Sequence, residues 1–207
     1  MPGYIAADTG GTFTDVVVFD GDGGAIRFAK TLTTYGSLVD GVAAGIAEAD
    51  GDLGKAAWLR HGTTHVINAF LQRRGAKAAL VATEGFRDAL EIRRGNRPAP
   101  FDPSQRRATP LIPRSLRFEA RERIAADGGV VEPLDEDALL ALVPALAAAG
   151  VEAVAVSFLN AYANPDHETR AAELLQKALP GVFVTAGTAL TREWFEYERT
   201  STAAANA

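Results

Sequence analysis

A short glycine-bearing segment between two β-rich stretches constrains the fold of this chain most strongly. Residues 4–7 are apolar and residues 15–20 are rich in β-branched side chains, so both stretches are predicted to be strands. A connection this short joins antiparallel strands. The chain is therefore expected to open on a β-hairpin. The connecting segment reads Asp8-Thr9-Gly10-Gly11-Thr12-Phe13-Thr14-Asp15.

The composition of this loop favours an anionic ligand. Adjacent glycines let backbone N–H groups approach an anion, because no Cβ intervenes, and successive N–H groups form an anion-binding concavity. Thr12 and Thr14 add hydroxyl donors, and Asp8 stands where Mg²⁺ would lie between a carboxylate and a phosphate. Asp15 either assists there or caps the second strand. The alternative is a plain hairpin turn whose glycines serve geometry alone.

Two common nucleotide-binding motifs do not describe this loop. A Walker A loop needs Gly-Lys-Ser/Thr and opens a helix. Here no lysine follows the glycines, and the next stretch is a predicted strand. The spacing of the glycines also differs from the Rossmann Gly-x-Gly-x-x-Gly pattern.

The rest of the chain predicts a mixed α/β protein. Residues 93–113 hold five prolines and interrupt the pattern, so they indicate a long loop or a subdomain boundary. We expect a phosphate-loop α/β subdomain over 1–113, a second small α/β subdomain over 114–190, and a helix over 191–207 that leads into a C-terminal region beyond Ala207. In chain order the further elements are predicted as strand 25–31, helix 37–49, strand 57–61, helix 66–74, strand 78–83, helix 85–92, a hairpin of 116–124 with 130–132, helix 135–149, strand 153–159, helix 164–179, strand 183–186 and helix 191–207.

Composition narrows the classes of function. The 207 residues carry a net charge of −5 with no basic stripe, which argues against a nucleic-acid partner. The chain has no cysteine, so a disulfide framework, a thiolate metal site and a cysteine nucleophile are excluded. No stretch approaches the roughly 18 apolar residues of a membrane span, and the N-terminus shows no leader pattern. We expect a cytoplasmic protein without a membrane partner.

The loop resembles the first phosphate motif of the actin, sugar-kinase and Hsp70 superfamily of ATPases, which reads Asp-x-Gly-Gly-Thr between two opening strands. The predicted order of three strands, helix, strand, helix and strand also suits the ribonuclease-H-like half-domain of that superfamily. The resemblance implies an actin-like ATPase half-domain with opening antiparallel hairpins, followed by a second α/β unit.

A longer series of motifs resembles the hydantoinase A/5-oxoprolinase family, in order and over nearly the whole chain. Two stretches depart from the family pattern: Tyr35-Gly36-Ser37, where a proline-containing stretch is usual, and residues 191–195. The matching blocks are Asp8–Asp15, His61-Gly62-Thr63-Thr64 with Asn68-Ala69, Arg73–Ala76, Thr83–Asp88, Glu91–Arg94, Asn96-Arg97-Pro98, Gly150–Val156, Ala163–Glu168 and Glu196–Thr202.

This resemblance implies an enzyme that uses ATP and Mg²⁺ to phosphorylate a carbonyl oxygen. Family members open a lactam or imide ring, or carboxylate a ketone, often with a hydantoinase B-like partner subunit. They are far longer, so the adenosine-binding half is expected beyond Ala207, and the fragment alone is expected to be inactive. By resemblance, Gly10, Gly11, Thr12 and Thr14 hold phosphates, and Asp8 orients the metal.

Further candidate residues lie outside the loop. Thr63 and Thr64 stand between a strand and a helix, and helix N-termini favour anions, so we expect them to face the transferred phosphate or the substrate. Alternatively, they only cap the helix. Arg94 and Arg97 suit bidentate contact with a carboxylate or phosphate of a substrate, or they are ordinary surface arginines. The three histidines His61, His65 and His167 show no spacing typical of a metal site.

Two other classes of function remain open from the sequence. A sugar-kinase-like small-molecule kinase shares the phosphate loop, but it needs a catalytic aspartate opposite the loop, and it leaves the motifs from His61 to Pro98 unexplained. A non-catalytic binding or assembly module is the second alternative.

Overall fold

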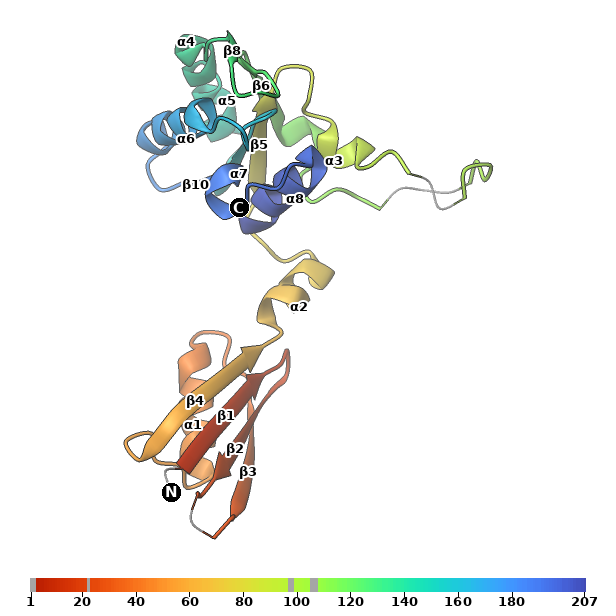
Figure 1. The fold of residues 1–207 in the computed structure, drawn as a ribbon. Helices are drawn as coiled ribbons and strands as arrows, with labels where there is room; N and C mark the ends of the chain where they lie inside the picture. Colours follow the sequence, from red (N-terminus) through yellow and green to blue (C-terminus); the bar gives the residue numbers. More distant parts are fainter. Residues whose placement is uncertain (1–2, 22, 97–98, 105–107) are drawn as a thin grey trace. The chain divides into compact units, whose positions relative to one another are not determined.

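The computed structural model describes residues 3–21, 23–96, 99–104 and 108–207. The chain divides into two compact units, Met1–Gly75 and Ala76–Ala207, and each has its own sheet (Figure 1). The division falls before the boundary expected near residue 113, because the strand at 78–83 pairs with later strands rather than with the N-terminal sheet.

The first unit is a four-stranded sheet in the order β3-β2-β1-β4 (Figure 1). Strands β1, β2 and β3 are antiparallel neighbours, whereas β4 pairs with β1 in parallel. The opening hairpins predicted from the sequence are therefore present. The elements are β1 (Gly3–Thr9), β2 (Phe13–Phe19), β3 (Ile26–Leu32), α1 (Leu38–Glu48), β4 (Ala56–Thr63) and α2 (His65–Gln72).

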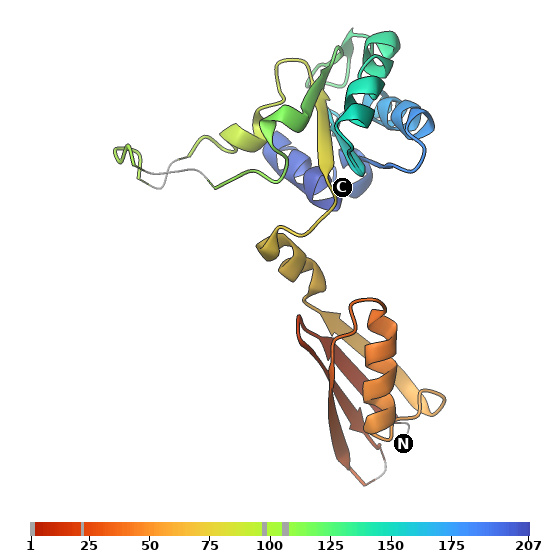
Figure 2. The same cartoon turned by 180° about the vertical axis from the view of Figure 1, so that it is seen from behind.

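Helix α1 covers one face of this sheet, as Figure 2 shows from behind. Ile5, Val16 and Val18 point toward it and are almost fully buried. Two glycines on α1 permit the close approach, since a Cβ at Gly45 would lie 2.6 Å from Val16 Cγ2. The alternation of buried and exposed residues along β1 and β2 thus separates a core face from an open face, and the open face carries Asp8.

The second unit is built on a parallel sheet in the order β10-β9-β5-β6. Both central strands, β5 and β9, are buried along almost their whole length, which is typical of a parallel sheet covered on both faces. The elements are β5 (Ala78–Thr83), α3 (Ala89–Ile92), η1 (Arg114–Leu116), β6 (Arg117–Ala120), β7 (Arg123–Ile124), β8 (Val130–Glu132), α4 (Glu136–Leu140), α5 (Val143–Ala148), β9 (Ala153–Ser157), α6 (Asp166–Ala178), β10 (Phe183–Ala186), α7 (Gly187–Leu190) and α8 (Glu196–Asn206).

Two separate cores cover the faces of this second sheet. Val81 and Val156 pack with Leu139 and Leu175, which come from α4 and α6. The neighbouring residues of the strands face the other way and pack with Ala203 of α8. The second unit is therefore a three-layer arrangement of helices, sheet and helices, and the predicted C-terminal helix forms part of its core.

Two predicted elements are divided in the structure. The predicted strand 116–124 becomes β6, which pairs with β5, and β7, which forms the expected hairpin with β8. The predicted helix 135–149 becomes α4 and α5, with Pro144 in the first turn of α5. A proline has no backbone N–H to donate and its ring clashes with the preceding turn, so it disfavours a straight, continuous helix through this position.

Within the described part of the chain, no helix combines the length and the apolar character needed to cross a membrane.

Candidate functional site

The glycine loop lies where β1 ends and β2 begins, in the first unit. The Gly10 amide donates to the carbonyl oxygen of Phe13 at 2.9 Å, so it serves the turn and is not available to a ligand. Across the described residues, no acceptor is found for the amides of Gly11 and Thr12. The loop therefore offers two free consecutive amides, which is the minimum for an anion-binding concavity.

The two acids of the loop stand directly opposite each other on the open face. Asp8 of β1 pairs with Asp15 of β2 in the antiparallel register. Directly opposite side chains have Cβ atoms about 4.5–5.5 Å apart, and like charges at that spacing destabilise the pair. Lys30 offsets one charge, because its Nζ lies 2.7 Å from Asp15 Oδ1. Among the described residues Asp8 forms no ion pair, so its carboxylate is the group that can take a cation.

The neighbour of Asp8 on its other side has no side chain. Gly62 of β4 pairs with Asp8, and a Cβ there would lie 3.4 Å from Asp8 Oδ1. The position on β4 that pairs with Asp8 therefore places no side chain beside this carboxylate. This space suits a hydrated cation, since Mg²⁺ keeps several of its waters when a protein carboxylate holds it.

Thr12 and Thr14 have different positions. Thr12 is exposed in the loop, as a phosphate donor needs to be. Thr14 is fully buried on the opposite face from Asp8, and its Oγ1 lies 3.5 Å from Thr33 Oγ1. Thr14 thus lies behind the loop, on the face away from Asp8. Its hydroxyl does not face a ligand bound beside Asp8.

Thr63 and Thr64 lie next to the loop and are engaged in the turn from β4 to α2. The Thr63 hydroxyl donates to the Thr9 carbonyl oxygen and accepts from the His65 amide, both at 3.1 Å. The Thr64 amide also donates to Thr9 O at 3.1 Å, and its hydroxyl accepts from Asn68 Nδ2. Thr64 is the N-cap residue of α2, but its side chain makes no capping hydrogen bond, and the bonds of both threonines fix the start of α2 against the end of β1.

Two residues beside the loop were not among the predicted site residues. Asn68 of α2 lies so close that a Cβ on Gly11 would be 3.0 Å from its Nδ2. Tyr35 donates its hydroxyl to the Gly11 carbonyl oxygen, and its ring lies 5.8 Å from the ring of His65. The four-residue spacing of Thr64 and Asn68 on one helix was the available sequence signal. No local signal indicated the contact of Tyr35 with a residue 24 positions away.

Arg94 belongs to the second unit, whereas the glycine loop belongs to the first. Its Nε forms an ion pair with Glu198, and its guanidinium lies 5.3 Å from the centre of the Phe195 ring. The side chain is 61% exposed at a groove formed by α3 and the start of α8, so donors remain free for a ligand. Arg97, the other predicted substrate residue, lies outside the described residues.

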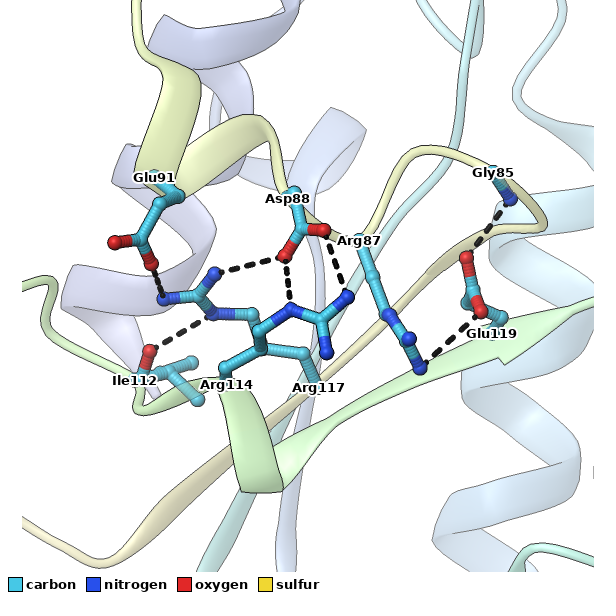
Figure 3. A network of polar contacts seen from close by, with 8 residues as sticks. All are labelled: Gly85, Arg87, Asp88, Glu91, Ile112, Arg114, Arg117 and Glu119. Atoms are coloured by element: carbon cyan, nitrogen blue, oxygen red, sulfur yellow. Dashed lines mark hydrogen bonds and ion pairs between the residues drawn. The ribbon is translucent and has the colours of Figure 1, made fainter.

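A network of ion pairs fixes the start of α3 to β6, close to Arg94 in sequence (Figure 3). The buried guanidinium of Arg117 bonds Asp88 at 3.3 Å, Glu91 at 3.0 Å and the Ile112 carbonyl at 3.0 Å. Arg114 binds the same aspartate from the surface. The hydrogen bond from Arg114, together with the nearby positive charges, holds the pKa of the Asp88 carboxyl below its ordinary value. Arg114 and Arg117 therefore have structural roles here.

Replacing Arg117 by methionine is expected to lower the free energy of unfolding by about 2–3 kcal/mol, because the Ile112 carbonyl and two carboxylates lose a buried donor. The matched control is Arg114→Met, which removes a surface partner of the same Asp88 and should cost less than about 1 kcal/mol. Urea unfolding followed by circular dichroism measures both. Equal losses would show that burial does not distinguish the two arginines.

Comparison with known proteins places this arrangement in a family. The model of the hydantoinase/oxoprolinase N-terminal region matches residues 4–179. Caprolactamase subunit alpha of Pseudomonas jessenii is 36% identical over 214 residues, which cover 98% of this chain and 30% of the relative. Acetophenone carboxylase gamma subunit of Aromatoleum aromaticum is 35% identical over 229 residues, covering 98% of this chain and 30% of the relative.

Two solved structures share the fold. The crystal structure of the ATP-dependent caprolactamase from Pseudomonas jessenii superposes with a TM-score of 0.84 at 35% identity, over 99% of this chain and 31% of that one. The nucleotide-free structure of acetone carboxylase superposes with a TM-score of 0.85 at 27% identity, over 98% of this chain and 31% of that one. The chain thus spans about a third of the length of these proteins, and its α/β fold is the one their matching regions have, consistent with an actin-like ATPase fold. The chain belongs to the hydantoinase/oxoprolinase N-terminal region family.

Proposed function

We propose that this chain supplies the phosphate-binding part of an ATP-dependent enzyme that phosphorylates the carbonyl oxygen of a lactam or imide and so drives hydrolytic ring opening. The observation that carries the proposal is the pair of free amides at Gly11 and Thr12 beside the unpaired carboxylate of Asp8. The ATP dependence of caprolactamase and acetone carboxylase supports a nucleotide ligand for a loop of this kind.

The chemistry uses ATP to activate an unreactive amide. The carbonyl oxygen of the ring attacks the γ-phosphorus, the bond from this phosphorus to the bridging oxygen breaks, and ADP leaves. Water then adds to the activated carbon, and the ring C–N bond breaks with a proton passing to the ring nitrogen, which leaves an amine and an acyl phosphate on the opened chain. A second water cleaves the acyl phosphate to the carboxylic acid and inorganic phosphate. Phosphoryl transfer depends mainly on positioning and on neutralisation of charge, so backbone amides and a metal-holding carboxylate are the groups that this step requires.

The residues divide into proposed roles. The amides of Gly11 and Thr12, with the Thr12 hydroxyl, would bind phosphate oxygens. Asp8 would hold Mg²⁺, whose charge would neutralise the phosphates. Asp15 would assist there, while Lys30 offsets its charge. Thr64, whose hydroxyl accepts from Asn68 and keeps its own proton free, would face the transferred phosphoryl group.

Substrate and partner are also proposals. The exposed guanidinium of Arg94 is proposed to contact the substrate, and Arg97 of the next motif is proposed to do the same. Because the relatives include a caprolactamase alpha subunit and a carboxylase gamma subunit, we propose that this chain works with a hydantoinase B-like subunit. The second candidate is carboxylation of a ketone, which the equally close fold of acetone carboxylase favours.

Product analysis tests the function. The assembled enzyme is incubated with ATP, Mg²⁺ and either 5-oxoproline, a hydantoin, ε-caprolactam, or acetone with bicarbonate. The proposal expects a ring-opened acid with stoichiometric ADP and phosphate. A carboxylated ketone would select the second candidate, and a stable phosphorylated sugar from a sugar panel would instead establish a kinase.

Replacing Asp8 by asparagine is expected to raise the Mg²⁺ concentration needed for half-maximal ATP-dependent turnover about tenfold, because a charged ligand contact of roughly 1.5 kcal/mol is lost. Asp40→Asn is the matched control, since Asp40 is an exposed aspartate in the first turn of α1. A magnesium dependence unchanged by Asp8→Asn would remove the metal role from this residue.

A further inference from the structure

The backbone carbonyl groups of Gly10, Gly11 and Thr12 all accept hydrogen bonds from one segment of the chain, residues 33–35. Thr33 Oγ1 donates to Gly10 O at 2.9 Å, and the Thr33 amide donates to Thr12 O at 2.9 Å. The Tyr35 hydroxyl donates to the carbonyl between them, that of Gly11. Residues 33–35 thus occupy the acceptors of three successive peptide groups.

Occupied carbonyls determine where the free amides point. In a planar trans peptide the C=O of one residue and the N–H of the next are on opposite sides. The Gly10 carbonyl turned toward Thr33 therefore directs the Gly11 N–H away from that segment. In the same way, the Gly11 carbonyl turned toward Tyr35 directs the Thr12 N–H away. The side of the loop left open presents donors, while the acceptors that would repel a phosphate are covered.

We propose that Thr33 and Tyr35 are positioning residues that hold the Gly11 and Thr12 peptide groups ready for a phosphate. This inference rests on the proposed function of the same loop. Neither hydroxyl is a ligand of the phosphate; each acts through a backbone carbonyl.

Both hydroxyls are themselves supported. Thr33 Oγ1 gives its proton to Gly10 O, so the buried Thr14 hydroxyl, 3.5 Å away, is the donor to Thr33. This assigns a role to Thr14 behind the loop. The Tyr35 ring packs against His65 at the start of α2.

The test compares Thr33→Val and Tyr35→Phe with Thr31→Val in the 207-residue chain. Each change removes one hydroxyl at nearly constant volume. Thr31 is the matched control, because its hydroxyl also donates to a backbone carbonyl, that of Gly41 in α1. Two quantities are measured by NMR: the carbonyl ¹³C shifts of Gly10 and Gly11 in the free protein, and the dissociation constant for MgATP.

We expect the Gly10 carbonyl shift to move in Thr33→Val and the Gly11 carbonyl shift to move in Tyr35→Phe. Each variant should bind MgATP about fivefold more weakly, which corresponds to roughly one hydrogen bond. Tyr35→Phe, which removes an exposed hydroxyl, should keep the wild-type melting temperature. Thr31→Val should change neither quantity. If the wild-type chain binds and both loop variants bind equally well, the positioning role is overturned while the proposed function stands. If the wild-type chain binds MgATP too weakly to measure, the same variants are compared in the assembled enzyme, and absence of MgATP binding there would overturn both.

Discussion

Gly11→Val is expected to weaken MgATP binding about 100-fold while the first unit stays folded. A Cβ at Gly11 would lie 3.0 Å from Asn68 Nδ2, so valine displaces Asn68 and places two methyl groups beside the free amides. Two hydrogen bonds to a charged phosphate together contribute about 3 kcal/mol or more, which corresponds to that loss of affinity. A ³¹P NMR titration of MgATP measures it.

Gly75→Val is the matched control for this change. A Cβ at Gly75 meets no atom within 4 Å, and its backbone does not have a positive φ, so a side chain fits there without displacement. We expect wild-type affinity for the control. Equal affinity for MgATP in Gly11→Val and Gly75→Val would show that the space at Gly11 is not where phosphate binds.

Glu168→Ala is expected to lower the free energy of unfolding of the second unit by about 3–5 kcal/mol, the cost of leaving buried polar partners uncompensated. The side chain is fully buried and accepts hydrogen bonds from the amides of Phe158 and Thr188 and from the Thr188 hydroxyl, at 2.7 Å each. Burial raises the pKa of this carboxyl, and the three donors act in the opposite direction. Glu168 therefore joins β9, α6 and the start of α7.

Urea unfolding followed by circular dichroism measures the effect, with Glu173→Ala as the control on the same helix. The Glu173 side chain is 66% exposed, and its ion pair with Arg170 is long, at 4.0 Å. Its removal should therefore cost less than about 0.5 kcal/mol. A loss in Glu168→Ala as small as that of the control would show that the buried carboxylate contributes little to stability.

The sequence was sufficient for features that depend on local pattern. Strands β1 and β2 follow from an apolar stretch and a stretch rich in β-branched residues, and the two glycines between them predicted a tight loop. Asp135 is the first residue of the predicted helix 135–149, and its carboxylate accepts from the Ala138 amide. Each of these features is determined within a few residues of chain.

Features that depend on contacts between residues far apart in the chain could not be predicted from local sequence patterns. The strand 116–124 is divided because β6 has its partner in β5, some 37 residues earlier, and a single sequence does not indicate that pairing. The division of the predicted helix 135–149 has a local cause, because Pro144 lies in the first turn of α5 and the sequence alone indicates a break there. At the site, the contacts of Thr33 and Tyr35 with the loop join residues more than 20 positions apart.

A titration of the ¹⁵N-labelled chain with MgATP, followed by its amide spectrum, examines the phosphate loop most directly. We predict that the largest shifts are those of the Gly11 and Thr12 amides, with a smaller shift at Gly10, whose N–H is already bonded to Phe13 O. Binding that leaves the Gly11 and Thr12 resonances in place, or that moves only residues of the second unit, would contradict the assignment of this loop to the nucleotide phosphates.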